Sequence, residues 1–387
     1  MNAPRDGFTT GTAAAGAALA ALTLLVEGRA PEHVTVPLPP FQWPPDSNGH
    51  TKARCSGFMR VPVCLCRLLC RENPSGEIFR AEAAVRKDGG DDPDVTSGAL
   101  ITAGVILEPS RRASLPDKDF IRLEGGKGVG RVTLPGLPIP VGEPAINPVP
   151  REQMRIALSR YAEKTSRRFG PCPPMSVTIS VAEGEELARR TLNPRLGITG
   201  GISILGTQGT VRPFSHAAWR ATIRQGLDVA LASGCAAVCL STGRRSEALL
   251  RQRYPRLAPQ AFIQAADFTA FSLCAAGAMP FADIVWGCFF GKLLKLAQGM
   301  EYTHARKGEI DFGELALLCS ESGAQCAGVI RLCATAAHAL DLLLTDEAGG
   351  LVLTLITRKA AVWAARFAGR DVRLNLFHPD GRLLCAA

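Results

Sequence analysis

Residues 193–209 combine five glycines with five hydroxyl or amide side chains. Glycine has no Cβ and readily adopts positive φ, so successive backbone amides in such a run can approach a polar ligand. The spacing Gly201-x-x-x-x-Gly206 is that of a phosphate loop, but Thr207 and Gln208 follow it where Lys and Ser or Thr would contact phosphate and magnesium. The run also lacks a Gly-x-Gly-x-x-Gly fingerprint. We therefore expect a ligand without a triphosphate, with a tight turn as the structural alternative.

Four carboxylates stand within seven residues of one turn: Asp88, Asp91, Asp92 and Asp94. Like charges this close raise the pKa of at least one member unless a cation, backbone amides or a charged ligand offset them. The cation could be a metal or the positive sulfonium of a cofactor. We interpret this acidic turn as functional, with a solvated turn as the alternative.

Two further segments could hold an anion. Hydroxyls surround the start of an alanine-rich helix that we expect to run to residue 26 with Thr10 or Thr12 as its cap, and a helix start presents free N–H groups. The second is residues 125–131, where alternating glycines are flanked by Lys127 and Arg131. A simple cap and a glycine turn are the structural alternatives.

His304 lies two residues before Arg306 and could act as an acid, a base or a carboxylate clamp. A surface histidine is the more common outcome, and the sequence leaves both open.

The elements that must position these groups change character along the chain. Strand-like segments, a helix over 151–167 and a strand over 176–181 indicate an α+β arrangement at first. From residue 196, strands at 236–240, 261–263 and 283–286 alternate with helices, as in a parallel sheet whose carboxyl edge binds ligands. We expect an α+β domain over 1–190, completed by about 310–387, and a Rossmann-like α/β domain over 191–309. In this scheme residues 193–209 form the opening βα turn, and a strand at 371–375 returns to the first domain.

Composition limits the partners. The net charge of +9 favours an anionic ligand, but aromatic residues make up only 6% and no run of Lys or Arg exceeds two residues. Nucleic acid is therefore not expected, whereas a small polyanionic substrate fits a diffuse positive field. We expect a cytoplasmic protein without a membrane segment, because no export signal or bilayer-length apolar run is seen. The sequence leaves open whether the chain forms a homo-oligomer.

Thirteen cysteines then act mostly as small apolar residues in a reducing compartment. The cluster Cys55, Cys64, Cys66 and Cys70 lacks a Cys-x-x-Cys pair and a matching histidine, so no metal site is expected. Residues 37–45 are rich in proline and are interpreted as an exposed loop.

Several motifs together resemble the enzymes that methylate carbon C-1 of cobalt-precorrin-5B in cobalamin biosynthesis. The matching segments are residues 9–12, 91–96, 128–133, 140–148, 193–215, 291–293 and 303–304. They occur in the family's order, and the combination is highly specific. The resemblance implies S-adenosylmethionine as methyl donor, a cobalt-precorrin ring with many carboxylates as acceptor, and a two-domain protein with one Rossmann-like part. Ala13 and Leu134 stand where the family usually has Cys and Lys. Neither a Cys nor a Lys at these two positions is therefore expected to be a catalyst.

With that resemblance, the candidate residues receive roles. The donor-binding candidates are Gly200, Gly201, Ser203, Gly206, Thr207, Ser241, Thr242, Gly243 and Asp267. The acceptor-binding candidates are Thr9, Thr10, Gly11, Thr12, Gly126, Gly128, Gly130, Arg131, Glu143, Asn147 and Lys292. The catalytic candidates are Asp91, Asp92, Asp94 and His304. A nicotinamide-dependent oxidoreductase and a non-catalytic corrinoid or nucleotide sensor remain the alternatives.

Overall fold

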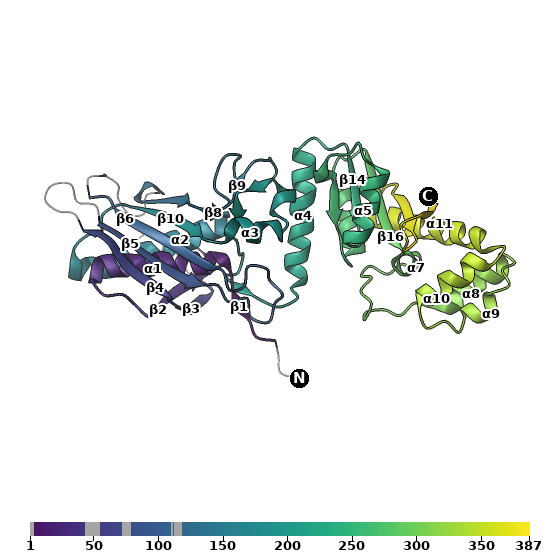
Figure 1. Ribbon diagram of the computed structural model, residues 1–387, viewed down its shortest axis with the longest axis horizontal. Helices are drawn as coiled ribbons and strands as arrows, with labels where there is room; N and C mark the ends of the chain where they lie inside the picture. The colour runs from purple at the N-terminus through teal and green to yellow at the C-terminus, as the bar shows by residue number, and fades with distance from the viewer. Residues whose placement is uncertain (1–3, 43–54, 72–78, 110, 112–117) are drawn as a thin grey trace. The chain divides into compact units, whose positions relative to one another are not determined.

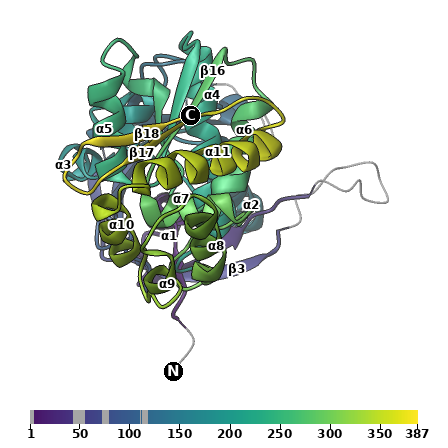
Figure 2. The ribbon, with the colours of Figure 1, turned by 90° about the vertical axis from the view of Figure 1, so that its right-hand side faces the viewer.

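The structure is a computed structural model that describes residues 4–42, 55–71, 79–109, 111 and 118–387. The chain forms two compact units, Met1–Ser215 and His216–Ala387, called unit 1 and unit 2 below (Figures 1 and 2). Unit 1 is α+β with a mixed sheet, and unit 2 is α/β with a mostly parallel sheet.

Unit 1 is built on a five-stranded sheet in the order β4-β5-β6-β10-β7. Neighbouring strands are antiparallel except β10 and β7, which are parallel. Helix α1 packs against β5 and β6, and α2 packs beside α1. The elements are α1 (Thr10–Glu27), β4 (Leu65–Arg71), β5 (Phe79–Arg86), β6 (Leu100–Leu107), β7 (Ile121–Gly125), α2 (Pro148–Phe169) and β10 (Met175–Val181).

Helix α1 is the core helix of unit 1. It is long and apolar enough to cross a membrane by length and composition, but 72% of it is buried within the protein. Its cap is Thr9, whose side chain accepts a hydrogen bond from the backbone N–H of Thr12, and the expected caps Thr10 and Thr12 lie inside the helix. Alanines therefore fill a tightly packed interface with the sheet.

A two-stranded ladder joins β2 (His33–Leu38) and β3 (Gly57–Pro62). Pro37, which we expected in an exposed loop, is a buried residue of β2 paired with Phe58. Proline has no backbone N–H to donate to a ladder, and it is therefore tolerated in edge strands. The last residues of the expected loop, 43–45, lie outside the described part of the chain.

The glycine run belongs to unit 1, which corrects its expected place as the opening βα turn of the Rossmann-like part. Its strands are two residues long: β11 (Ile198–Thr199) pairs with β9 (Arg131–Val132), and β12 (Gly201–Ile202) pairs with β8 (Gly128–Val129). Further on, β13 (Thr210–Val211) pairs with β1 (Gly7–Phe8). These ladders move the boundary between the units from the expected 190/191 to 215/216.

Unit 2 has a sheet in the order β15-β14-β16-β17-β18, parallel except for the edge strand β18. The strands predicted at 236–240, 261–263 and 283–286 correspond to β14, β15 and β16, and helices alternate with them as predicted. The elements are α4 (His216–Ala232), β14 (Ala237–Ser241), α5 (Arg244–Arg253), β15 (Phe262–Gln264), α6 (Thr269–Gly277), β16 (Asp283–Phe289) and α7 (Phe290–Ala297).

The C-terminal third of the chain completes unit 2, and not the first domain as expected. Strand β17 (Arg373–Phe377) is parallel to β16, and β18 (Leu383–Ala386) closes the edge. The helices of this part of the chain are α8 (Phe312–Glu321), α9 (Ala327–Ile330), α10 (Ala336–Thr345) and α11 (Gly349–Ala368). Helix α11 packs on α6 and α7 and buries Val352, Ile356 and Ala360 in the same core as the sheet.

Candidate functional site

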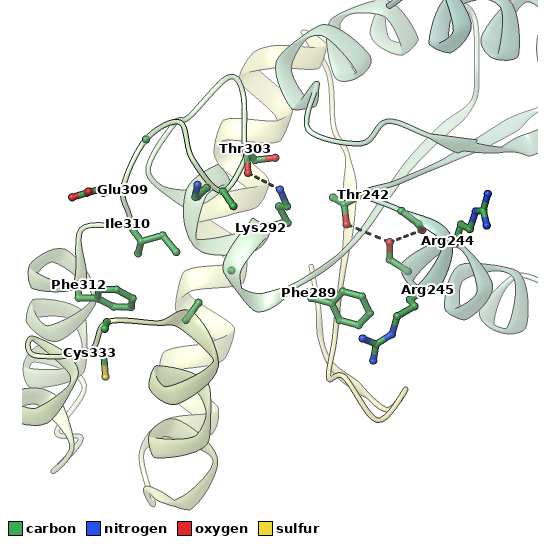
Figure 3. A pocket seen from close by; sticks show the side chains of 18 residues that line it. Thr242, Arg244, Arg245, Phe289, Lys292, Thr303, Glu309, Ile310, Phe312 and Cys333 are labelled. Atoms are coloured by element: carbon green, nitrogen blue, oxygen red, sulfur yellow. Dashed lines mark hydrogen bonds between the residues drawn. The ribbon is translucent and has the colours of Figure 1, made fainter. Parts of the chain in front are cut away.

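Unit 2 contains a cavity of about 900 Å³ at the carboxyl ends of β14 and β16 (Figure 3). Small-molecule sites fall in the range of about 300–1,000 Å³ and gather at this edge of α/β sheets. The lining residues are Thr242, Gly243, Arg244, Arg245, Ser246, Phe289, Gly291, Lys292, Lys295, Thr303, Ala305, Gly308, Glu309, Ile310, Phe312, Cys333, Ala334 and Ala336. We call this space the unit 2 cavity.

One wall of the unit 2 cavity is the turn after β14. The hydroxyls of Thr242 and Ser246 lie 3.3 Å apart, and Ser246 also donates to the carbonyl of Gly243. Gly243 is the N-cap of α5 and has no side chain to cap the N–H groups of the first turn. A Cβ placed on it would meet no described atom within 4 Å. Ser241 is fully buried behind this wall, so Thr242 and Gly243 are the members of the predicted set that face the cavity.

Two lysines of α7 form the floor. Lys292 pairs with Asp267, which follows β15, and donates to the carbonyl of Thr303 at 2.6 Å (Figure 3). Lys295, one helical turn further, donates to the carbonyl of His304 at 2.7 Å. Burial, and then the nearby Lys292 ammonium, lower the pKa of Lys295. Asp267 is therefore an ion-pair partner beneath the cavity and is not one of its lining residues.

The opposite wall is apolar. In Figure 3, Ile310, Phe312 and Cys333 lie on the other side of the space from Thr242 and Phe289. The Cys333 thiol lies 3.7 Å from Nδ1 of His338, and burial raises the pKa of this thiol. A ligand with a flat apolar part and a polar end fits such a cavity.

His304, predicted as a catalytic residue, does not line the unit 2 cavity. Its ring stacks on Tyr302 with centroids 6.0 Å apart and planes 9° apart, and its Nδ1 accepts a hydrogen bond from the N–H of Arg306. The neighbouring residues Thr303 and Ala305 reach the cavity instead. The geometry therefore makes His304 a support of this loop.

The acidic turn lies in unit 1, and its charges are offset from within the protein. Lys87, whose side chain is 1% exposed, pairs with Asp94 at 2.5 Å. Burial by itself would raise the pKa of Asp94, but the Lys87 ammonium and hydrogen bonds from Lys87 and Thr96 outweigh it and hold this pKa below its usual value. A hydrogen bond from Arg5 lowers the pKa of Asp88 in the same direction. Lys87 and Arg5 thus provide the offsetting cations that the sequence analysis named as the alternative to a raised carboxyl pKa.

The other two carboxylates of the turn accept hydrogen bonds from backbone N–H groups. Asp91 accepts a hydrogen bond from the N–H of Arg5, and Asp92 accepts one from the N–H of Phe214. Phe214 has φ of 57°, a left-handed conformation that is uncommon for a bulky residue. These contacts give each predicted carboxylate a structural task within unit 1.

The start of α1 is occupied by protein groups. The N–H of Gly11 donates to the carbonyl of Leu205, and the hydroxyl of Thr12 donates to that of Gly209. Thr10 donates to Leu205 and accepts from its N–H, while Thr9 caps the helix. The expected anion seat is thus filled by the glycine run, which lies beside it.

The glycines of the run serve close packing of backbone on backbone. A Cβ on Gly201 would lie 2.1 Å from the carbonyl oxygen of Gly128, and one on Gly206 would lie 2.4 Å from Oγ1 of Thr9. Ser203 is buried and donates to Asn193, while Thr207 is exposed. Gly200, with φ of 78°, is the glycine of this set with open space around its Cβ position.

The remaining predicted residues also lie in unit 1. Gly126, Gly128 and Gly130 pack tightly, since a Cβ on any of them would come within 2.5 Å of a neighbouring atom. Arg131 is exposed and its guanidinium donates to the carbonyl of Gly142. Glu143 is exposed 3.8 Å from Arg151, and Asn147 precedes α2 without capping it through its side chain.

The structure thus divides both predicted ligand sets between the units. Thr242, Gly243 and Lys292 line the unit 2 cavity, with Asp267 and Ser241 behind them. The sequence analysis missed Arg244, Arg245, Lys295, Ile310 and Phe312. A signal existed for Lys295, because a second lysine three residues after Lys292 lies on the same helix face.

No group of three His, Cys, Asp or Glu side chains with metal-site geometry occurs among the described residues. All thirteen cysteines are free thiols, including the Cys55 to Cys70 cluster. Burial raises the pKa of Cys66 to about 11, so this thiol stays protonated at neutral pH.

A mostly parallel sheet with a ligand-sized cavity at the carboxyl ends of its strands defines unit 2 as an α/β unit with a candidate ligand site. Comparisons with known proteins give the family. A family model described as CbiD matches residues 1–44 and 69–213, and one described as CbiD, C-terminal domain, matches residues 302–387. The chain belongs to the CbiD family, which confirms the resemblance found in the sequence.

Relatives match along nearly the whole chain. The cobalt-precorrin-5B C(1)-methyltransferase of Nitratidesulfovibrio vulgaris is 48% identical over 387 residues, covering 99% of this chain and 92% of the relative. The protein of the same name from Geobacillus thermodenitrificans is 42% identical over 385 residues, covering 98% and 94%. A crystal structure of a cobalamin biosynthesis protein (cbiD) from Archaeoglobus fulgidus is 28% identical, with a TM-score of 0.36 over 76% of this chain and 79% of that one.

Proposed function

We propose that this chain transfers a methyl group from S-adenosylmethionine to carbon C-1 of cobalt-precorrin-5B, giving cobalt-precorrin-6A in cobalamin biosynthesis. The observation that carries the proposal is 48% identity over 99% of the chain to a relative of that name. The order of the two family matches along the chain supports it.

The reaction requires that the methyl group of the donor be aligned with carbon C-1 of the acceptor. Methyl transfer from a sulfonium is an in-line displacement: the new bond forms at C-1 while the electron pair of the old bond stays on sulfur. Proximity and orientation alone can contribute about 7–11 kcal/mol to such a step. The donor loses its positive charge as the transfer proceeds, so a carboxylate that gripped the sulfonium tightly would slow it. Glu309 is the one carboxylate residue among the residues that line the unit 2 cavity.

For the donor we propose the unit 2 cavity. The open backbone at Gly243 and the hydroxyls of Thr242 and Ser246 suit its polar groups, and Ile310 and Phe312 suit the adenine ring. Ser241 and Asp267 would then support this wall from behind. Direct binding of the ribose hydroxyls by Asp267 stays a prediction. Calorimetric titration of Asp267→Ala with S-adenosylmethionine tests it, and unchanged affinity would remove Asp267 from the site.

For the acceptor, the unit 1 residues and Lys292 stay predictions. The net charge of +9 supports a substrate that carries many carboxylates, and Arg131 offers an exposed guanidinium. The donor roles of the glycine run, from Gly200 to Thr207, are likewise untested. Asp91, Asp92 and Asp94 are proposed to orient groups of unit 1, and no deprotonating base is required of them or of His304.

The reaction itself is tested by incubating the protein with S-adenosylmethionine labelled in its methyl group and with cobalt-precorrin-5B. Mass spectrometry should find one added methyl on the ring and S-adenosylhomocysteine in equal amount. Binding of both ligands without methyl uptake would favour a corrinoid sensor instead.

We also propose a reducing, cytoplasmic setting. Its support is that all thirteen cysteines are free thiols, several of them packed in the cores of the two units. Labelling with a thiol reagent in the unfolded protein, before and after reduction, should count the same thirteen thiols.

A further inference from the structure

We infer that Lys295 is the carboxylate-binding group of the unit 2 cavity, a role that rests on the proposed function. The ligand chemistry is a carboxylate, which could come from the methionine part of S-adenosylmethionine or from an acetate or propionate of the corrin precursor. Neither the sequence motifs nor the family resemblance drew attention to this residue.

The first support is the burial of Lys295 at the border of the cavity. The residue is only 6% exposed, yet it lines the cavity. An ammonium has three N–H donors, and one of them is taken by the carbonyl of His304 at 2.7 Å. Two of its N–H donors therefore remain for a further partner, and the residue borders the cavity.

The second support is charge. Among the described residues, no carboxylate forms an ion pair with Lys295, and Asp267, whose charge acts on it, pairs with Lys292. Of these two neighbouring ammonium groups, Lys292 has an ion-pair partner and Lys295 has none among the described residues. A buried charge without a partner is costly, and proteins normally pair it. A ligand carboxylate would supply the missing negative charge.

The third support is the surrounding wall. Arg244 and Arg245 begin α5, whose N-cap Gly243 gives no side-chain bond to the first turn. Against these cations the lining holds the single acid Glu309. The positive end of α5 and the two arginines favour an anion in the same space.

A purely structural role predicts different behaviour. If Lys295 served only to hold the loop through its hydrogen bond to the carbonyl of His304, then Lys295→Met would lower the melting temperature. If the lysine is kept for a ligand, Lys295→Met removes an uncompensated charge and leaves the melting temperature of the free protein unchanged or higher. Lys295→Arg keeps the positive charge and should therefore retain binding of the carboxylate.

The decisive experiment is isothermal titration calorimetry with paired ligands. One pair is S-adenosylmethionine and its decarboxylated analogue, and the other is cobyrinic acid and its heptamethyl ester. For the pair that supplies the carboxylate, the wild type should prefer the acid by about 10- to 100-fold, and Lys295→Met should lower that preference about tenfold. The pair that responds identifies the source of the carboxylate.

Lys307→Met is the matched control, since Lys307 carries the same charge near the cavity without lining it. It should keep the preference for the acid. If the wild type binds the acids and Lys295→Met keeps the full preference, the role of Lys295 is wrong while the proposed function stands. If the wild type binds neither S-adenosylmethionine nor cobyrinic acid, both the proposed function and this role are contradicted.

Discussion

Glycines in two regions of the molecule have different structural roles. In the run over 193–209 of unit 1, a Cβ on Gly201 would strike the backbone of Gly128. At the edge of the unit 2 sheet, a Cβ on Gly243 would meet no described atom within 4 Å. The dense run therefore packs chain against chain, whereas the single glycine after β14 leaves space for a ligand. Glycine density alone does not separate these two uses.

The largest effect is expected in unit 1. Gly201→Ala should lower the free energy of unfolding by about 3 kcal/mol or more, because backbone atoms must move to admit the methyl group. Chemical denaturation of the purified protein measures this. Gly200→Ala, one residue earlier with open space, should cost only about 1–2 kcal/mol for its left-handed φ. Equal losses in both variants would contradict the packing role of Gly201.

The ion pair beneath the acidic turn should have the next largest effect. Asp94→Asn leaves Lys87 buried without its carboxylate and should cost about 3 kcal/mol at pH 7. The folded pKa of Asp94 is lowered, so its contribution is present at neutral pH and is lost as pH falls through that value. The gap between wild type and variant should therefore shrink below about pH 4.

Unfolding curves recorded between neutral and acidic pH test this dependence. Glu143→Gln, an exposed carboxylate 3.8 Å from Arg151, is the control and should stay within about 0.5 kcal/mol of wild type. A gap for Asp94→Asn that does not change with pH would show that the ion pair is not its cause.

At the cavity, the comparison predicts a change in binding with little change in stability. Gly243→Ala should weaken S-adenosylmethionine about tenfold, because its methyl group enters ligand space, while the unfolding free energy changes by under about 0.5 kcal/mol. Calorimetry and thermal unfolding measure the two. Gly350→Ala, an open position on α11, should leave the affinity unchanged. Normal affinity of Gly243→Ala would remove this edge from the donor site.

The smallest effect concerns the start of α1. Thr9→Ala removes the cap of the helix and should cost about 1 kcal/mol of unfolding free energy, and Thr9→Ser should restore most of it. The affinity of the unit 2 cavity for S-adenosylmethionine should not change in either variant. A weaker affinity in Thr9→Ala would contradict the confinement of the donor site to the unit 2 cavity.

The sequence predicted the alternating part of unit 2 well, because buried strands such as β14 and β16 carry local apolar patterns with Gly and hydroxyl residues after them. It could not place the glycine run. Strands of two residues carry no period, and the partners of Gly201 and Ile202 lie more than 70 positions earlier at Gly128 and Val129. Pairings this distant leave no local trace.

Charges were harder to predict than elements. The acidic turn was recognised, but its offsetting cations depend on burial of Lys87 and on the approach of Arg5, which only the folded chain shows. Lys295 was missed because a lysine on an amphipathic helix normally faces water. Its burial arises from the loop after α7, whose carbonyl at His304 covers it.

The ladder between β1 and β13 has a consequence for how the chain folds during synthesis. It joins residues 7–8 to residues 210–211, so the first strand of unit 1 has no partner until the last one has left the ribosome. Contacts of such high sequence separation slow folding. Unit 2 is continuous from residue 216 and forms its sheet without help from the N-terminus. Unit 1 is therefore the part of the nascent chain that waits longest for its closing contact and depends most on protection from aggregation.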